Sequence, residues 1–279
     1  MSNVDLRVAP DVTLHVKQLS GQFVSTSGRV PYLDDKKSYS VVVDSGEVSL
    51  DAASLTALMA HVLGNDHSNL RKVRLTIHDD GSLQQKGTID AAINIPFNAK
   101  SQVSVTSDGR IRVTTKSMKG FGVPVKPVMS LFRIEMDDLV KVDPGRGVEV
   151  VDNDLILDPS RLLPAPGIKG RLSAVRVEHG SLVQVFGSGV AKSISAQPLS
   201  RNHIYWRGAQ LSFGKLMMSD TDLELVDNDP TDPFDFSIDE WNAQLIAGYS
   251  KTLPNKGLRT FMPDYHDLGV TRRPKTRLR

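Results

Sequence analysis

The sequence predicts an α+β fold in which antiparallel β-strands make up most of the structure. Two segments carry apolar residues at helical spacing, and each is followed by segments in which apolar and polar residues alternate as in half-buried strands. Short turns rich in Gly, Asp, Asn and Ser separate the alternating segments, which favours hairpins. No stretch approaches the roughly 18 apolar residues of a membrane-spanning helix.

The first helical pattern is short and has one apolar face. Its apolar residues fall at i, i+3, i+4, i+7 and i+8, and they are Leu55, Leu58, Met59, Val62 and Leu63. Asp51 is placed to cap the N-terminal end, because its carboxylate can accept a hydrogen bond from an unpaired amide, and Gly64 is a stop signal. We therefore expect a helix between these two residues.

The second helical pattern is longer. Its apolar stripe consists of Val125, Val128, Met129, Phe132, Met136, Leu139 and Val140. Pro124 and Pro127 are placed in the first turn, and the pattern ends before the Asp143-Pro144-Gly145 turn. Leu131 and Ile134 lie off the stripe, so this helix is expected to need apolar partners on more than one side.

Strands are expected on both sides of the second pattern. Before it, residues 73–77 alternate and turn into 83–90, and residues 103–105 form a hairpin with 111–113 through Ser107-Asp108-Gly109. After it, two more hairpins are expected, one joining 148–151 to 155–157 and one joining 172–178 to 182–186. The two halves share an order of elements but not their residues, so they are not a sequence repeat.

Glycine, proline and polar runs divide the chain into four parts. Residues 11–187 form the predicted main body, in which 159–170 is expected to be a rigid connection rather than a helix. Residues 188–202 are small and polar and are expected to be a linker. Residues 203–268 form a second β-rich segment with one short helix within 237–249, and 269–279 form a basic tail.

Composition excludes some kinds of chemistry. The chain has 279 residues and no cysteine, which excludes thiol catalysis, thiolate metal sites and disulfides. Its first ten residues contain no basic segment followed by an apolar run, so no secretory leader is expected within the sequence as given. A chain of this size can bury a sizeable core without disulfides or metals.

The net charge of +2 comes from the C-terminal end of the sequence. Five of the 34 basic residues lie in the last eight positions, namely Arg272, Arg273, Lys275, Arg277 and Arg279, and the rest of the chain is slightly acidic. Such a tail is a solvated end, or it is attracted to anionic membrane lipids. Because the body has no basic stripe interleaved with aromatic residues, specific nucleic-acid binding is not expected.

The sequence motifs do not support a catalytic site. Ser188 lies in Gly187-Ser188-Gly189, which lacks the Gly-x-Ser-x-Gly spacing of a nucleophile elbow. The seven histidines are scattered, and His61 is expected on the surface of the first helix. An acidic run extends from Asp220 to Asp239, but it lacks the glycine and closing glutamate of an EF-hand, so a solvated acidic loop is expected there rather than a metal site. No cofactor is predicted.

Two segments resemble bacterial proteins that handle lipids. Residues 146–150, 153–159 (Asn-Asp-Leu-Ile-Leu-Asp-Pro), 162–164, 170–177 and 180–184 resemble the closing half of tubular lipid-binding (TULIP-type) envelope proteins, and the likeness extends over about 40–187. It implies a strongly curved antiparallel sheet wrapped around a long amphipathic helix. Residues 208–216 and 219–223, within 203–227, resemble strand repeats of AsmA-like lipid-transport proteins. Both resemblances imply a periplasmic or membrane-peripheral location, and a cytoplasmic one stays open.

We therefore expect a protein that binds or transfers a lipid or a fatty-acid-like amphiphile without catalysing a reaction. The apolar groove between helix and sheet is expected to be lined by Leu58, Met59, Val62, Met118, Phe121, Val128, Met129, Phe132 and Met136. Methionine-rich walls adapt well to acyl chains, although they are also common filler in ordinary cores. Two alternatives remain: a structural or partner-binding envelope protein with a filled core, and a metal-assisted hydrolase that uses the acidic run.

Overall fold

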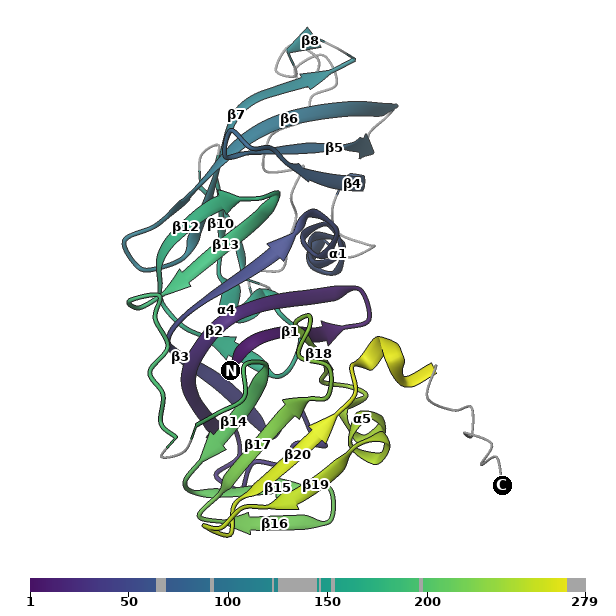
Figure 1. Ribbon diagram of the computed structural model, residues 1–279. Helices are drawn as coiled ribbons and strands as arrows, with labels where there is room; N and C mark the ends of the chain where they lie inside the picture. The colour runs from purple at the N-terminus through teal and green to yellow at the C-terminus, as the bar shows by residue number, and fades with distance from the viewer. Residues whose placement is uncertain are drawn as a thin grey trace, which may run out of the picture.

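The computed structural model describes residues 1–63, 69–90, 93–121, 123–124, 145, 147–151, 154–195 and 198–269. Figure 1 shows a β-rich molecule in which a few helices lie against large sheets, and this confirms the predicted α+β, mostly antiparallel fold class. The predicted tail lies almost entirely outside the described residues. So does the second helical pattern, apart from Pro124.

The larger of the two main sheets has eleven strands within the described residues. Its main path runs β12 (Leu172–Glu178), β13 (Ser181–Phe186), β3 (Tyr39–Asp51), β2 (Val12–Ser25), β1 (Ser2–Ala9), β14 (His203–Arg207), β17 (Asp222–Asp227), β20 (Leu258–Met262) and β19 (Tyr249–Thr252). Two further strands join from the side, β11 (Gly167–Lys169) on β3 and β18 (Phe234–Ser237) on β1, both in parallel. The pairing of β17 with β20 is parallel as well, so antiparallel pairing predominates without being universal.

The second sheet has seven strands within the described residues. It runs β4 (Leu70–Ile77), β5 (Ser82–Asp90), β6 (Asn94–Val105), β7 (Ile111–Gly120), β10 (Asp154–Leu157) and β9 (Val148–Val151), and β8 (Val123–Pro124) pairs with β7. The hairpins predicted from turn residues are confirmed, because Val103 pairs with Val113 across the Gly109 turn and Leu155 pairs with Val150. Pro124 corrects a prediction: it pairs with Lys119 in a strand instead of opening a helix.

Three α-helices lie within the described residues: α1 (Ala52–Leu63), α4 (Pro159–Leu162) and α5 (Trp241–Ala247). The predicted cap of α1 is confirmed, since the amide of Ser54 donates to the Asp51 carboxylate at 2.7 Å. Residues 159–170 were predicted to contain no helix, and this was wrong for the first four of them, which form α4. The Asp158 side chain accepts a hydrogen bond from the Ser160 amide as the cap of α4, and Pro159 occupies its first turn. The helix within 237–249 is shorter than predicted, since Ser237 ends β18 and Tyr249 begins β19.

Bulges account for the curvature of the larger sheet. The long strands β2 and β3 bend around the interior in Figure 1, and their pairing shifts register twice, between Val16 and Gln18 and between Ser20 and Gly21. Such bulges increase local twist and bend a strand. Gly21 suits its place because a Cβ there would lie 2.3 Å from the carbonyl oxygen of Val42.

The larger sheet runs through both predicted β-rich parts of the chain. Residues 2–9 lie outside the predicted body of 11–187, yet they form β1, which pairs with β2 on one side and with β14 and β18 from the C-terminal segment on the other. One hydrophobic core contains residues of β1–β3, α1, β7, β13, β14, β17, β18 and α5. A small hairpin of β15 (Gln210–Phe213) and β16 (Leu216–Ser219) and a 3₁₀ turn, η2 (Tyr265–Gly269), complete the described chain.

Candidate functional site

The candidate site is an apolar cavity inside the curve of the larger sheet. Its volume is about 110 Å³. The wall combines Leu14, Val16, Leu19 and Phe23 of β2, Tyr39, Val41, Val48 and Leu50 of β3, Leu55, Leu58 and Met59 of α1, Leu182, Gln184 and Phe186 of β13, Ile204 and Trp206 of β14, and Trp241 of α5, with further apolar residues from β1, β7, β10, β11, α4 and β18. Because protein interiors have few voids larger than a water molecule, a cavity of this size is a notable feature.

Strand alternation and one bulge direct the β2 side chains into the cavity. Leu14 and Val16 are two residues apart and point to the same face, as in any strand. Leu19 follows three residues later and still reaches the cavity, because the register shift after Val16 changes the phase of the strand. The bulge therefore extends the apolar wall along the bent part of β2.

The cavity wall offers shape and apolar surface rather than reactive groups. The wall residues include no Asp, Glu, Lys, Arg or His within the described part of the chain, and Gln184 supplies the only side-chain amide there. Burial raises the pKa of the Tyr39 phenol, so this hydroxyl stays protonated at neutral pH. The wall can hold an apolar group, and among its described side chains there is no carboxylate, imidazole or amine with which to transform it.

Two of the residues predicted to bind lipid lie in this wall. Leu58 is buried and Met59 half-buried on the face of α1 that lines the cavity. Met118 is half-buried in β7 and Phe121 is 54% exposed, and neither lines the cavity. The side chain of Val62 lies outside the described residues, as do Val128, Met129, Phe132 and Met136.

Most of the wall comes from strands that the sequence prediction did not single out. In β3 the residues Val41, Val48 and Leu50 line the cavity, and β13 adds Leu182 and Phe186. Their alternation was visible in the sequence, but alternation indicates only that a residue is buried and not whether it faces packed side chains or empty space. The cavity depends on how three or more elements fit together.

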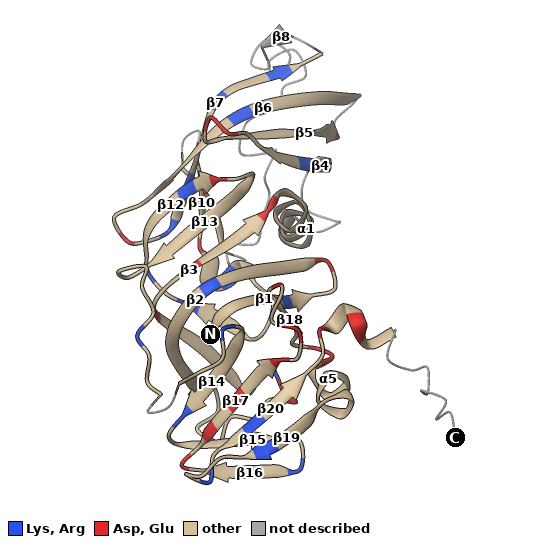
Figure 2. Cartoon of the chain, viewed as in Figure 1, with Lys and Arg blue, Asp and Glu red and all other residues tan. Residues whose placement is uncertain are grey.

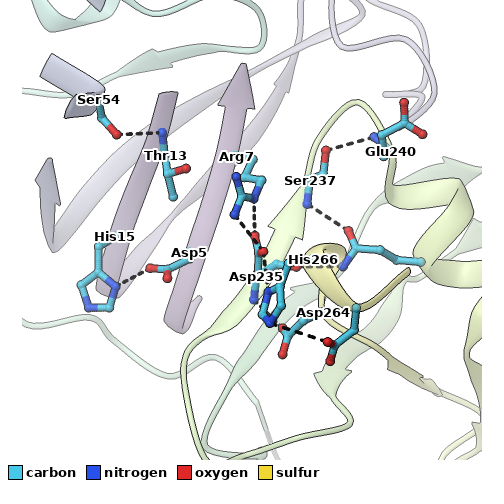
Figure 3. Close-up of polar contacts among 12 residues, drawn as sticks. Asp5, Arg7, Thr13, His15, Ser54, Asp235, Ser237, Glu240, Asp264 and His266 are labelled. Atoms are coloured by element: carbon cyan, nitrogen blue, oxygen red, sulfur yellow. Dashed lines mark hydrogen bonds and ion pairs between the residues drawn. The ribbon is translucent and has the colours of Figure 1, made fainter. Parts of the chain in front are cut away.

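The acidic run contributes to a separate cluster of polar residues. Acidic residues lie around β18 and near α5 in Figure 2. Figure 3 shows that Arg7 of β1 and His266 of η2 converge on the buried Asp235. Arg7 donates two hydrogen bonds to the two carboxylate oxygens of Asp235, at 2.6 and 3.0 Å, and the Nδ1 atom of His266 lies 3.0 Å from Asp235 Oδ2. Asp235 is therefore occupied by ion pairs that join three elements.

Asp264 lies beside this cluster and is almost completely buried. One of its carboxylate oxygens accepts a hydrogen bond from the amide of Asp235 at 2.6 Å. Burial raises the pKa of the Asp264 carboxyl to about 7, so about half of these carboxyl groups carry a proton at neutral pH. Through its hydrogen bond with the Asp235 amide, the Asp264 carboxyl group helps to hold β18 against η2.

Three possible metal ligands meet at the edge of the same cluster. Ligand atoms of Asp232, Asp264 and His266 lie within 4.8 Å of one another. However, one ring nitrogen of His266 is already hydrogen-bonded to Asp235, and Asp264 is partly protonated at neutral pH. Among the described residues of the acidic run, only Asp232 belongs to this group.

Among the described residues, the serine in the glycine-rich turn after β13 has no base as a hydrogen-bond partner. The hydroxyl of Ser188 lies 3.0 Å from that of Ser45, and the amide and carbonyl of Val190 are its other partners. A serine hydroxyl and a backbone amide or carbonyl are too weakly basic to take the proton from a nucleophilic serine. His61 is exposed, as predicted, and its ring lies 3.0 Å from Asp11.

Comparisons with protein-family models, curated proteins and solved structures found no match to this chain. Among the described residues, no helix is both long and apolar enough to cross a membrane. The geometry of the cavity and the chemistry of its wall are therefore the features that indicate a function.

Proposed function

We propose that the protein binds a lipid or a similar amphiphile, with the apolar chain in the cavity, and that it does so without catalysing a reaction. The observation that carries the proposal is the apolar wall, which encloses about 110 Å³ and has no ionisable side chain other than the Tyr39 phenol among its described residues. Binding sites for apolar ligands are concave and mostly apolar, with few polar groups. The likeness to lipid-handling envelope proteins agrees with the proposal.

The volume limits how much of an acyl chain the cavity can hold. A water molecule takes up about 30 Å³ in the liquid, so the cavity of about 110 Å³ holds about four groups of that size. A methylene group is close to water in size, so burying about four methylenes at ~0.8 kcal/mol each contributes about 3 kcal/mol. Because association itself costs ~4 to 15 kcal/mol, tail burial alone gives weak binding and contacts to a head group must add affinity.

The first test is whether purified protein carries or takes up such a ligand. Mass spectrometry under gentle conditions, followed by organic extraction, should recover a species with an acyl or similar apolar chain. Protein stripped of that species should then bind cis-parinaric acid, whose polyene fluoresces when its chain is buried, with saturation at one molecule per chain.

The filled-core alternative gives the opposite result in both measurements. Extraction would yield no apolar species, and titration with cis-parinaric acid would show no saturable signal. In that case the space in the wall would be a packing defect of a structural protein. A matched titration with a short, fully polar carboxylic acid controls for binding to surface cations.

A further inference from the structure

The larger sheet opens beside the cavity. Strand β1 meets β14 at one pair, Ser2 with His203, whereas β2 runs past that point to Ser25. Beyond the pair, β2 is held by β3 and β14 by β17. Within the described residues no backbone pairing joins the outer half of β2 to β14.

Side chains close the gap between these two strands. The rings of Phe23 from β2 and Trp206 from β14 meet edge to face, with centroids 5.7 Å apart, and Phe23 also stacks on Tyr39 at 4.5 Å. Phe23 and Trp206 are both half-buried. Side chains change rotamer far faster and at lower cost than a hydrogen-bonded ladder opens, so this part of the cavity wall can open without breaking a ladder.

A groove of mixed polar and apolar lining lies on the other side of the same side chains. It has a volume of about 1360 Å³, and it shares with the cavity wall the residues Met1, Leu19, Phe23, Val41, Ile204 and Trp206. Its own lining includes amides and hydroxyls such as Gln18, Gln22, Ser20 and Tyr205. The two spaces are therefore adjacent, and only the groove has many polar groups in its lining.

The segment after β13 runs along this groove and is tied to both strands. The Gln18 side chain donates to the carbonyl of Gly189 at 3.0 Å, and Arg207 donates to the carbonyl of Ile194 at 2.7 Å. The amide of Lys192 donates to the hydroxyl of Ser20 at 3.2 Å. These contacts keep polar groups of the backbone and side chains along the groove, where the head of an amphiphile could bind.

We propose that the contact between Phe23 and Trp206 is a gate, through which a single-chain amphiphile inserts its tail from the groove into the cavity while its polar head stays in the groove. The inference rests on the proposed function and adds the route and orientation of the ligand. It also explains how a small apolar cavity gains the head-group contacts that the tail alone lacks.

The first experiment measures the rates of uptake and release of cis-parinaric acid by stopped-flow fluorescence. Trp206→Ala removes one side of the gate, so both rates should rise several-fold while the equilibrium affinity changes less. Tyr249→Ala is the matched control, because Tyr249 is an exposed aromatic residue in β19 that lines neither space. Rates for Trp206→Ala that equal those of the parent would overturn the gate.

The second experiment blocks the groove without changing the gate. Since the chain has no cysteine, single cysteines can be placed at exposed positions and labelled with a bulky maleimide. A label at Gln22→Cys in the groove should slow uptake several-fold. Labels at Ala60→Cys, on the exposed face of α1, and at Ser250→Cys, in β19, should leave the rate unchanged.

The outcomes separate the two proposals. If the label at Ala60→Cys slows uptake and the one at Gln22→Cys does not, the entrance lies at the α1 side and the gate is refuted. If the parent binds cis-parinaric acid but no label affects the rate, the gate is likewise refuted while the proposed function stands. If the unlabelled parent binds no cis-parinaric acid, the proposed function fails and the gate fails with it.

Discussion

At the scale of single residues, side chains two positions apart in the same helix have different surroundings. Leu58 is 7% exposed and lines the cavity, whereas Ala60, two positions on, faces solvent. Leu55 and Met59 complete the inner face of α1, one turn before and one residue after Leu58. The helical period alone therefore selects which substitutions alter the cavity.

This difference gives a test at one helix. Leu58→Trp should fill the cavity and abolish uptake of cis-parinaric acid, while destabilising the protein by the ~1 to 3 kcal/mol that is typical of overpacking. Ala60→Trp adds still more bulk to the exposed face and should leave uptake unchanged. Fluorescence titration measures uptake, and urea denaturation measures the free energy of unfolding. Equal uptake by the parent and Leu58→Trp would place the ligand elsewhere.

At the scale of elements, local signals predicted well and distant pairings did not. Three features that depend on residues close in sequence were predicted correctly. They are the Asp51 cap of α1, the hairpin of β6 and β7 that turns at Gly109, and the hairpin of β9 and β10. The parallel pairing of β1 with β18 joins residues more than 200 positions apart, and no local pattern indicates it. The helix α4 was missed because the prolines and glycines after it outweighed the Asp-Pro start signal.

The candidate site was predictable to the same extent. Helical spacing located Leu58 and Met59 in what proves to be the cavity wall, although more than a third of that wall comes from β2, β3 and β13. Met118 and Phe121 were expected there, but Met118 in β7 and Phe121 in the turn after it do not line the cavity. Empty space results from the misfit of several elements, so a single sequence indicates it poorly.

The polar cluster around Asp235 makes one contact between elements depend on pH. Burial raises the pKa of Asp264 to about 7, and the hydrogen bond to Asp235 raises the pKa of His266. In both cases the folded protein holds the proton more tightly than the unfolded chain. The stability that these two groups contribute is therefore greatest at low pH, and it is lost as pH rises from about 4 through 7 for Asp264 and above about 6.5 for His266.

Asp264→Asn should remove the larger of these two effects. The asparagine cannot ionise. The free energy of unfolding of the variant, relative to that of the parent, should therefore increase between pH 4 and 8, by at most about 4 kcal/mol. Urea denaturation at pH 4.5 and pH 8 measures the difference. Asp220→Asn, at an exposed position, should run parallel to the parent at both pH values. A difference between Asp264→Asn and the parent that does not change with pH would contradict the assigned pKa.

At the scale of the whole molecule, the C-terminal segment is part of the main sheet and shares its core. Four residue pairs join β1 to β18, and the Arg7–Asp235 ion pair at 2.6 Å connects the same two strands. Trp206 and Trp241, the only tryptophans in the chain, both belong to the C-terminal segment and both line the cavity with residues of β2 and β3. The cavity therefore exists only when both parts are folded together.

This arrangement predicts that the two parts unfold together. During thermal unfolding, tryptophan fluorescence reports on the C-terminal segment, and far-ultraviolet circular dichroism reports on strands throughout the chain. Because the shared sheet and core couple the two parts, both signals should change at the same midpoint temperature. Saturating cis-parinaric acid should raise the midpoint temperature of both signals by the same amount. Two separate transitions, or a ligand effect on only one signal, would show that the segment after 202 folds independently, and the cavity could then not require Trp206 or Trp241 for its wall.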